Sequence, residues 1–223
     1  MTVNEITSLV GKDFVKNFQN EMDLILQPLR KHIAKGRPLS LGKELWEYAV
    51  SDAIDGGEWC GAGHSIIDVK IGKDIGCDVK SISHHIAGKM TAEASMYQTF
   101  QGGTAELFKN QDTAGLWDLF VNGWIKKVKS MKEYYMLTIV RDSNLNCSIL
   151  CFKYNNNVPA YSDTYCSFLT ETGKTSDCNL KINCIADPSL MDIRIYKNKT
   201  RLELRLKQKI FSDSTFCLPI YKF

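Results

Sequence analysis

The sequence lacks the features that mark several classes of protein. It contains no uninterrupted apolar run long enough to span a bilayer, and Met1 to Glu5 lack the basic segment of a signal peptide. No internal repeat of about 20 to 50 residues is present, and no low-complexity tract is longer than Asn155 to Asn157. We therefore expect an intracellular, folded protein that makes no use of a membrane.

Cysteine pairs at metal-binding spacing are also missing. The chain has eight cysteines, but none of them form a Cys-x-x-Cys pair. Such pairs are typical of structural zinc sites, and evenly spaced cysteines are typical of disulfide frameworks in secreted proteins. The scattered pattern favours reduced and mostly buried thiols.

A strong excess of one charge is absent as well. The 223 residues carry a net charge of only +3, with 44% hydrophobic and 24% charged residues. This is the composition of an ordinary globular protein with one well-formed core. Any polyanionic partner must therefore be argued from where the charges lie, because their sum is small.

Apolar periodicity predicts the main elements. A helix is expected from about Glu5 to Lys35, kinked or divided at Pro28, and a second one over 41–54 that turns Leu45, Tyr48 and Ala49 inward. We expect the following further segments: a glycine-rich loop at 55–63, a hairpin at 65–83, helices at 91–110 and 113–132, and strands at 134–140 and 147–154.

The order of these elements predicts an α/β fold. We expect a mixed central β-sheet flanked by helices, with a β-rich C-terminal part. The whole chain, 1–223, is predicted to be one domain with a core at about 40–152 and a β-rich subdomain at about 155–223.

The predicted hairpin carries charges in segments otherwise suited to burial. Its strands flank a Gly72-Lys73-Asp74 turn, and Asp78 and Lys80 project to the same face because side chains alternate along a strand. Cys77 and Val79 then face the core. Depending on register, an antiparallel hairpin can bring the Asp68 carboxylate within a few Å of Asp78.

Two carboxylates this close predict a cation between them. Their repulsion is about 4 kcal/mol at about 4 Å and an effective dielectric constant near 20. Mg²⁺ would relieve it, with Asp68, Asp78 and the backbone carbonyl of Val79 as oxygen ligands. Lys80 beside them can orient a water toward an electrophile, which is the equipment for hydrolysing a phosphodiester.

These residues resemble the motif of a known nuclease superfamily. Asp68, nine intervening residues and Asp78-Val79-Lys80 resemble the PD-(D/E)XK motif, with Ile67 where the family often has proline. The short spacing is similar to that of type II restriction endonucleases. The resemblance implies a restriction-endonuclease-like core and a Mg²⁺-dependent, site-specific cut in double-stranded DNA that leaves 5′-phosphate ends. It also implies a homodimer in the cytoplasm of a bacterial or archaeal cell.

The helix before the hairpin resembles the first core helix of that family. Glu47, which follows Trp46, matches the glutamate that supports the metal, directly or through water, and Glu44 is the alternative. A solvated glutamate on a helix face is an equally simple interpretation of either residue.

Other interpretations of the hairpin remain open. Asp68-Val69-Lys70 is itself an acid-x-lysine triplet, with Asp55 or Glu58 as its upstream acid. The charges can also form ordinary cross-strand ion pairs. The functional alternatives are a nuclease of the same superfamily in DNA repair or junction resolution, and a non-catalytic nucleic-acid-binding module.

Two segments are candidates for contact with DNA. Polar side chains follow the triplet directly and can bind phosphates or base edges: Ser81, Ser83, His84, His85 and Lys89. Near the C-terminus, residues 201–207 alternate charge with leucine, which predicts a strand with one buried and one mostly cationic face. Arg201, Arg205 and Lys207 supply its cations, although a solvated sheet face has the same pattern.

Overall fold

The computed structural model groups the chain into two compact units. It describes residues 1–35, 41–61, 67–83, 89–94, 104–142, 144–153, 166–170, 178–183, 191–196, 202–207 and 214–223. The first unit comprises Met1–His84, Ser130–Tyr154 and Asp213–Phe223, and the second comprises His85–Lys129 and Asn155–Ser212. The units therefore alternate along the sequence, and each is described by itself.

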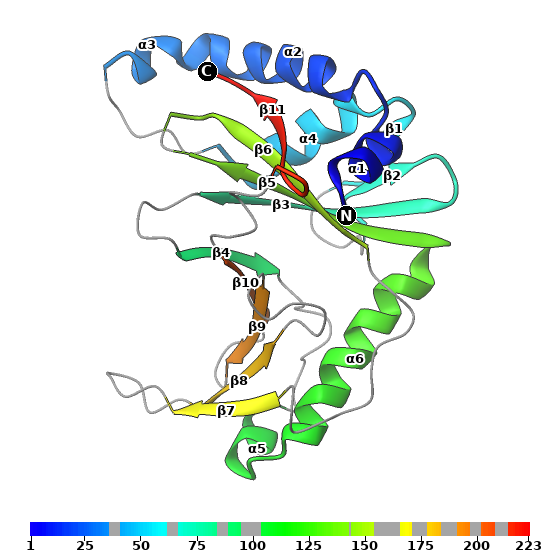
Figure 1. Cartoon of the computed structure of the whole chain (residues 1–223), viewed down its shortest axis with the longest axis vertical. Helices are drawn as coiled ribbons and strands as arrows, with labels where there is room; N and C mark the ends of the chain where they lie inside the picture. Colours follow the sequence, from blue (N-terminus) through cyan, green and yellow to red (C-terminus); the bar gives the residue numbers. More distant parts are fainter. Residues whose placement is uncertain are drawn as a thin grey trace. The chain divides into compact units, whose positions relative to one another are not determined.

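A mixed six-stranded sheet forms the centre of the first unit, in the order β1-β2-β3-β5-β6-β11 (Figure 1). Its strands are β1 (Gly57–Trp59), β2 (Val69–Ile71), β3 (Ile75–Ser83), β5 (Glu133–Arg141), β6 (Cys147–Lys153) and β11 (Leu218–Tyr221). Strands β3 and β5 run parallel, and the other neighbours are antiparallel. The chain thus has the mixed α/β class expected from its sequence.

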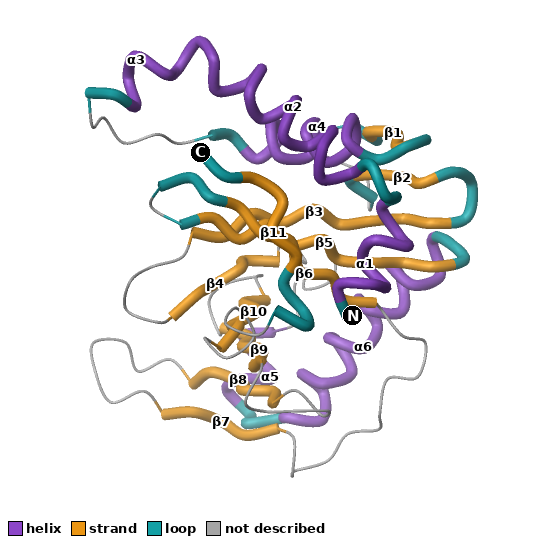
Figure 2. Tube along the Cα trace, turned by 45° about the horizontal axis from the view of Figure 1, so that its top comes forward, coloured by secondary structure: helices purple, strands orange, loops and turns teal. Residues whose placement is uncertain are grey.

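Helices cover one face of this sheet (Figure 2). They are α1 (Val3–Val10), α2 (Phe14–Leu26), the 3-10 turn η1 (Gln27–Leu29), α3 (Arg30–Ile33) and α4 (Lys43–Ala53). The buried side chains of α2 and α4 join those of the sheet in a single core: Phe14, Phe18, Met22, Leu26, Trp46, Ala49, Val50, Cys77, Val79, Leu137, Ile139 and Ile149. Within the described ranges, no helix has the length and apolarity to cross a membrane.

The first predicted helix is wrong at its start, where it is not continuous across Gly11. The chain breaks at Gly11, whose φ of +92° is accessible to glycine and unfavourable for other residues. A capping box between Thr2 and Glu5 starts α1, and the irregularity expected at Pro28 is the η1 turn.

The second predicted helix is confirmed as α4, but its inward face is partly wrong. Ala49 is buried, whereas Leu45 and Tyr48 are each 37% exposed. Trp46 and Val50 fill the core instead, because the face of α4 that meets the sheet is rotated from the one we predicted.

The second unit contains an antiparallel five-stranded sheet, in the order β4-β10-β9-β8-β7. Its elements are β4 (Lys89–Ala94), α5 (Thr104–Lys109), α6 (Thr113–Ser130), β7 (Cys166–Thr170), β8 (Cys178–Asn183), β9 (Met191–Tyr196) and β10 (Leu202–Lys207). The predictions of α6 and of a strand at β10 are confirmed. The helix predicted from residue 91 is wrong over β4, because Thr91 to Ala94 pair with β10.

Strands β10 and β9 of this second sheet pair in a defined register. Leu202 lies opposite Ile195 and Leu204 opposite Ile193. Glu203 lies opposite Arg194, and Arg205 lies opposite Asp192. Charged positions of β10 are therefore paired with both a basic and an acidic position of β9.

The glycine-rich loop predicted at 55–63 is wrong in part. Residues Gly57–Trp59 form β1 and pair with β2. Gly57 lies directly under the end of α4, where a Cβ atom would come within 2.3 Å of the Ser51 carbonyl oxygen. The chain can therefore pass from α4 into the sheet edge only without a side chain at this position.

The described cysteine side chains agree with the prediction of reduced thiols. Cys60, Cys77, Cys147, Cys151 and Cys217 are unpaired, and all except Cys60 are buried. Burial raises the pKa of the Cys147 and Cys151 thiols to about 12. Burial likewise raises the pKa of the Cys77 thiol well above its ordinary value.

Candidate active site

The predicted hairpin is present as β2 and β3. Val69 lies opposite Cys77 and Ile71 opposite Ile75, and the turn between the strands begins at Gly72 with a φ of +59°. Cys77 and Val79 belong to the core, as the alternation predicted. Asp78 and Lys80 therefore project from the other face of β3.

Asp68 lies where the pairing of β2 with β3 becomes irregular. Its backbone N–H donates to the Cys77 carbonyl at 3.0 Å, although Cys77 is already the partner of Val69. Asp68 and Val69 therefore both lie opposite Cys77, as the two residues of a β-bulge do. A β-bulge changes the direction in which a side chain points. Here the Asp68 carboxylate reaches β3, where its Oδ2 accepts the Val79 N–H at 2.8 Å.

The ammonium of Lys80 lies between two oxygens of this site. Lys80 Nζ is 3.3 Å from Asp68 Oδ2 and 3.4 Å from the Val79 carbonyl oxygen. The side chains of Lys80 and Asp68 are only 11% and 12% exposed, so this ion pair is largely shielded from water. The structure therefore brings together Asp68, Val79 and Lys80, three of the sequence-predicted site residues.

Asp78 is buried and bonded to a residue that sequence reasoning missed. Its side chain is held by Tyr134 of β5, whose hydroxyl donates to Asp78 Oδ1 at 2.9 Å. Asp78 is 2% exposed and Tyr134 is fully buried. No local pattern pointed to Tyr134, because its position next to Asp78 depends on β5 pairing with β3 in parallel.

Glu47 is buried on α4 beside the start of β2. It is 1% exposed, and its Oε2 accepts the indole N–H of Trp59 at 3.2 Å. Trp59 is the strand partner of Val69, the residue that follows Asp68. Glu44 is exposed instead, so burial favours Glu47 over Glu44 as the glutamate that supports the site.

The alternative triplet, Asp68-Val69-Lys70, has upstream acids that are exposed to solvent. Asp55 lies in an exposed turn, and Glu58 is an exposed residue of β1. Glu58 lies opposite Lys70 across the antiparallel β1–β2 pair, which is the position of an ordinary surface charge pair. The shielded contact of Asp68 with Lys80 favours the Asp78-Val79-Lys80 triplet.

The candidate DNA contacts are described only in part. Ser81 is half-buried on β3, and the backbones of Ser83 and Lys89 lie at the end of β3 and the start of β4. The backbones of Arg205 and Lys207 lie in β10. His84, His85 and Arg201 lie outside the described residues.

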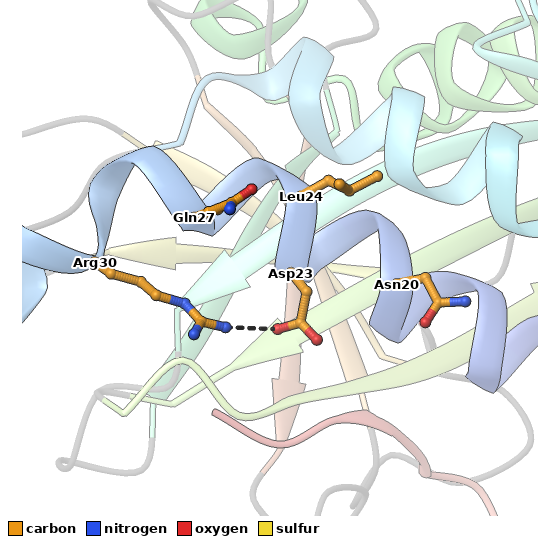
Figure 3. Close-up of a pocket in the computed structure, with 5 residues that line it drawn as sticks. All are labelled: Asn20, Asp23, Leu24, Gln27 and Arg30. Atoms are coloured by element: carbon orange, nitrogen blue, oxygen red, sulfur yellow. Dashed lines mark hydrogen bonds and ion pairs between the residues drawn. The ribbon is translucent and has the colours of Figure 1, made fainter.

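A surface hollow in the first unit lies elsewhere, along α2, η1 and α3 (Figure 3). It is lined by Asn20, Asp23, Leu24, Gln27 and Arg30. The Arg30 guanidinium lies 3.4 Å from Asp23 Oδ1, which also accepts the Tyr221 hydroxyl at 3.0 Å. None of these lining residues is among the sequence-predicted site residues.

The oxygen donors at the hairpin suit a hard cation. Carboxylates of Asp68 and Asp78 and the Val79 carbonyl are the ligand types that Mg²⁺ prefers, and a Mg²⁺ site commonly uses only one or two carboxylates. Among residues whose side chains the structure describes, no group of three or more His, Cys, Asp and Glu side chains is arranged to hold a metal. Asp68 Oδ2 and the Val79 oxygen already bind a cationic group, Lys80, which shows that they attract positive charge.

Comparisons with known proteins give no family for this chain. No protein-family model matches it. No significant match is found among curated proteins or among solved structures.

Proposed function

We propose that this protein is a magnesium-dependent endonuclease whose active site lies at the β2–β3 hairpin. One observation carries the proposal: the Lys80 ammonium contacts both Asp68 Oδ2 and the Val79 carbonyl oxygen. The resemblance to PD-(D/E)XK nucleases assigns these two oxygens to a metal ion and the ammonium to the attacking water. This assignment requires that Asp68 Oδ2, the Val79 carbonyl oxygen and the Lys80 ammonium lie close together.

Each residue of the site has a distinct role in this proposal. Asp68 and Asp78 hold the cation, together with the Val79 carbonyl oxygen. The Val79 N–H fixes the Asp68 carboxylate from the backbone of β3, so the carboxylate is oriented before substrate arrives. Lys80 orients the attacking water and offsets negative charge near the phosphoryl group, and Glu47 supports the site from α4.

Bound Mg²⁺ supplies polarisation of the phosphoryl oxygen and a lowered pKa for a coordinated water. The chain supplies the position of the reacting groups. Because Asp68 and Lys80 are shielded, their charges act at close range in a medium less polar than water. The expected products carry 5′-phosphate and 3′-hydroxyl ends, as the resemblance implies.

The proposed substrate is double-stranded DNA cut at a specific site, as by type II restriction enzymes. Ser81 follows the triplet on β3, but alternation points its side chain to the face opposite Asp78 and Lys80, so it is not proposed to contact the scissile phosphate. The candidates for contact with DNA are Ser83, His84, His85, Lys89, Arg201, Arg205 and Lys207. A homodimer would match the two-fold symmetry of a palindromic site.

The test is digestion of the DNA of a fully sequenced genome and of plasmids with purified protein. We expect cleavage with Mg²⁺ and none with EDTA. Discrete fragments would support restriction, whereas smearing or structure-dependent cutting would support a repair or junction nuclease. No Mg²⁺-dependent cutting on several diverse DNAs would contradict the proposal.

A further inference from the structure

Tyr134 is the residue of the site that the nuclease motif does not include. We infer that Tyr134 is a positioning residue, whose hydroxyl holds the carboxylate of Asp78 in the orientation that binds the divalent cation. The inference rests on the function proposed above, because it assigns Asp78 to a cation. It goes beyond that function by adding a side chain from β5, Tyr134, to the site.

The contact joins two buried groups that are distant in sequence. The Tyr134 hydroxyl donates to Asp78 Oδ1 at 2.9 Å across 56 positions of chain. Tyr134 is fully buried and Asp78 is 2% exposed. In this setting a phenol that donates to a carboxylate stabilises its charged form and fixes the rotation of its side chain.

The register explains how the tyrosine reaches Asp78. Tyr134 lies opposite Gly76, while Asp78 lies opposite Met136, so the phenol extends along β3 from one position to the next on the same face. A Cβ atom at residue 76 would lie only 3.2 Å from the Tyr134 ring and 2.7 Å from Met131 Cγ. Gly76 therefore leaves the space that the Tyr134 ring occupies. This space is a second observation that supports the contact between Tyr134 and Asp78.

The chemistry of metal sites indicates what this contact does. Carboxylates that bind metals are themselves commonly held by hydrogen bonds, and loss of such a partner costs about 10–100-fold in metal affinity or activity. Without the hydroxyl, the Asp78 carboxylate gains rotational freedom that cation binding must remove. The expected consequence is weaker binding of the cation.

The experiment measures cation binding directly, without DNA. Calorimetric titration with Ca²⁺ is carried out on the wild-type protein, Tyr134→Phe, Asp78→Asn and the control Tyr135→Phe. Tyr135 is the next residue of β5, on the other face, and its hydroxyl donates to Glu133. Thermal unfolding of each variant shows whether the fold is kept.

We expect Tyr134→Phe to weaken Ca²⁺ binding about tenfold and Tyr135→Phe to leave it unchanged. The Mg²⁺ concentration for half-maximal cleavage should rise by a similar factor in Tyr134→Phe, while the rate at saturating Mg²⁺ changes less. A folded Tyr134→Phe protein with wild-type Ca²⁺ affinity and Mg²⁺ dependence would overturn the inference and leave the proposed function intact. A wild-type protein without Ca²⁺ binding, or an Asp78→Asn variant that binds Ca²⁺ normally, would overturn both.

Discussion

Lys80 and Asp68 form an ion pair in which the ammonium lies 3.3 Å from carboxylate Oδ2. Lys80 lies on β3 and Asp68 directly precedes β2, and the pair is largely shielded from water. The carboxylate is held on its other side by the Val79 N–H at 2.8 Å. The proposed function uses this fixed pair, because it requires an ammonium and a carboxylate oriented toward the same point of the sheet.

Replacement of Asp68 should lower stability. Asp68→Ala leaves the Lys80 ammonium and the Val79 N–H without this acceptor in a shielded site, at a cost of roughly 2–4 kcal/mol in the free energy of unfolding. Asp68→Asn keeps an amide oxygen for the N–H and should cost less. Urea unfolding with EDTA present, followed by tryptophan fluorescence, gives both values. An Asp68→Ala protein as stable as wild type would contradict this account of the pair.

Replacement of Lys80 should separate cation binding from catalysis. Lys80→Met removes a positive charge that competes with a divalent cation for Asp68 Oδ2, so Ca²⁺ affinity should rise about tenfold, equivalent to ~1.4 kcal/mol. Cleavage should fall roughly 100-fold or more, because the group that orients water is lost. Calorimetry and a plasmid assay measure the two quantities. Lys73→Met, in the exposed turn of the same hairpin, is the control and should change neither. Weaker Ca²⁺ binding by Lys80→Met would contradict the competition.

Stability should fall in alkaline solution. Cys147 and Cys151 have folded-state pKa values of about 12 because they are buried, against an ordinary value of 9.0. Each thiol stays neutral in the folded protein and ionises in the unfolded chain, so its contribution to stability is complete below pH 9. That contribution is lost at up to about 1.4 kcal/mol per pH unit as the pH rises toward 12.

Urea unfolding at pH 8 and pH 10 tests this expectation. The variant Cys151→Ala should lose less stability between the two pH values than wild type, because one ionisable group is gone. Equal losses in both proteins would show that Cys151 does not titrate as its burial implies.

The glycine at the α4–β1 connection should resist substitution. In Gly57→Ala the new Cβ would lie 2.3 Å from the Ser51 carbonyl oxygen, a backbone atom that cannot move away cheaply. We expect a loss of about 2 kcal/mol in thermal or urea unfolding. In the control, Gly42→Ala, the nearest atom is the flexible Glu44 side chain at 3.4 Å, so the loss should be below about 1 kcal/mol. A tolerated Gly57→Ala would contradict the described packing.

Local signals predicted the hairpin and its charges well. Alternation around the Gly72 turn was enough to place Cys77 and Val79 in the core, because period-two alternation and turn residues act over a few positions. The break at Gly11 was also readable in principle, since the Thr2 and Glu5 capping box and the glycine mark both ends of α1.

Features that depend on pairing between distant parts of the chain could not be predicted from the sequence. Residues 91–94 favour a helix by composition, yet they form β4 because β10, more than one hundred positions later, supplies its partner. The same reason hid Tyr134, which reaches Asp78 only when β5 lies parallel to β3. Trp59 was hidden by the prediction of a loop where β1 forms.

The most direct test of the account is the initial rate of plasmid cleavage in saturating Mg²⁺ for wild type, Asp78→Asn and Asp74→Asn. Asp74 is an exposed acid in the turn of the same hairpin and serves as the control. We expect Mg²⁺-dependent cleavage by wild type, a loss of roughly 100-fold or more in Asp78→Asn, and a rate within about twofold of wild type in Asp74→Asn. Equal rates for wild type and Asp78→Asn, or no cleavage by wild type, would contradict a nuclease site at this hairpin.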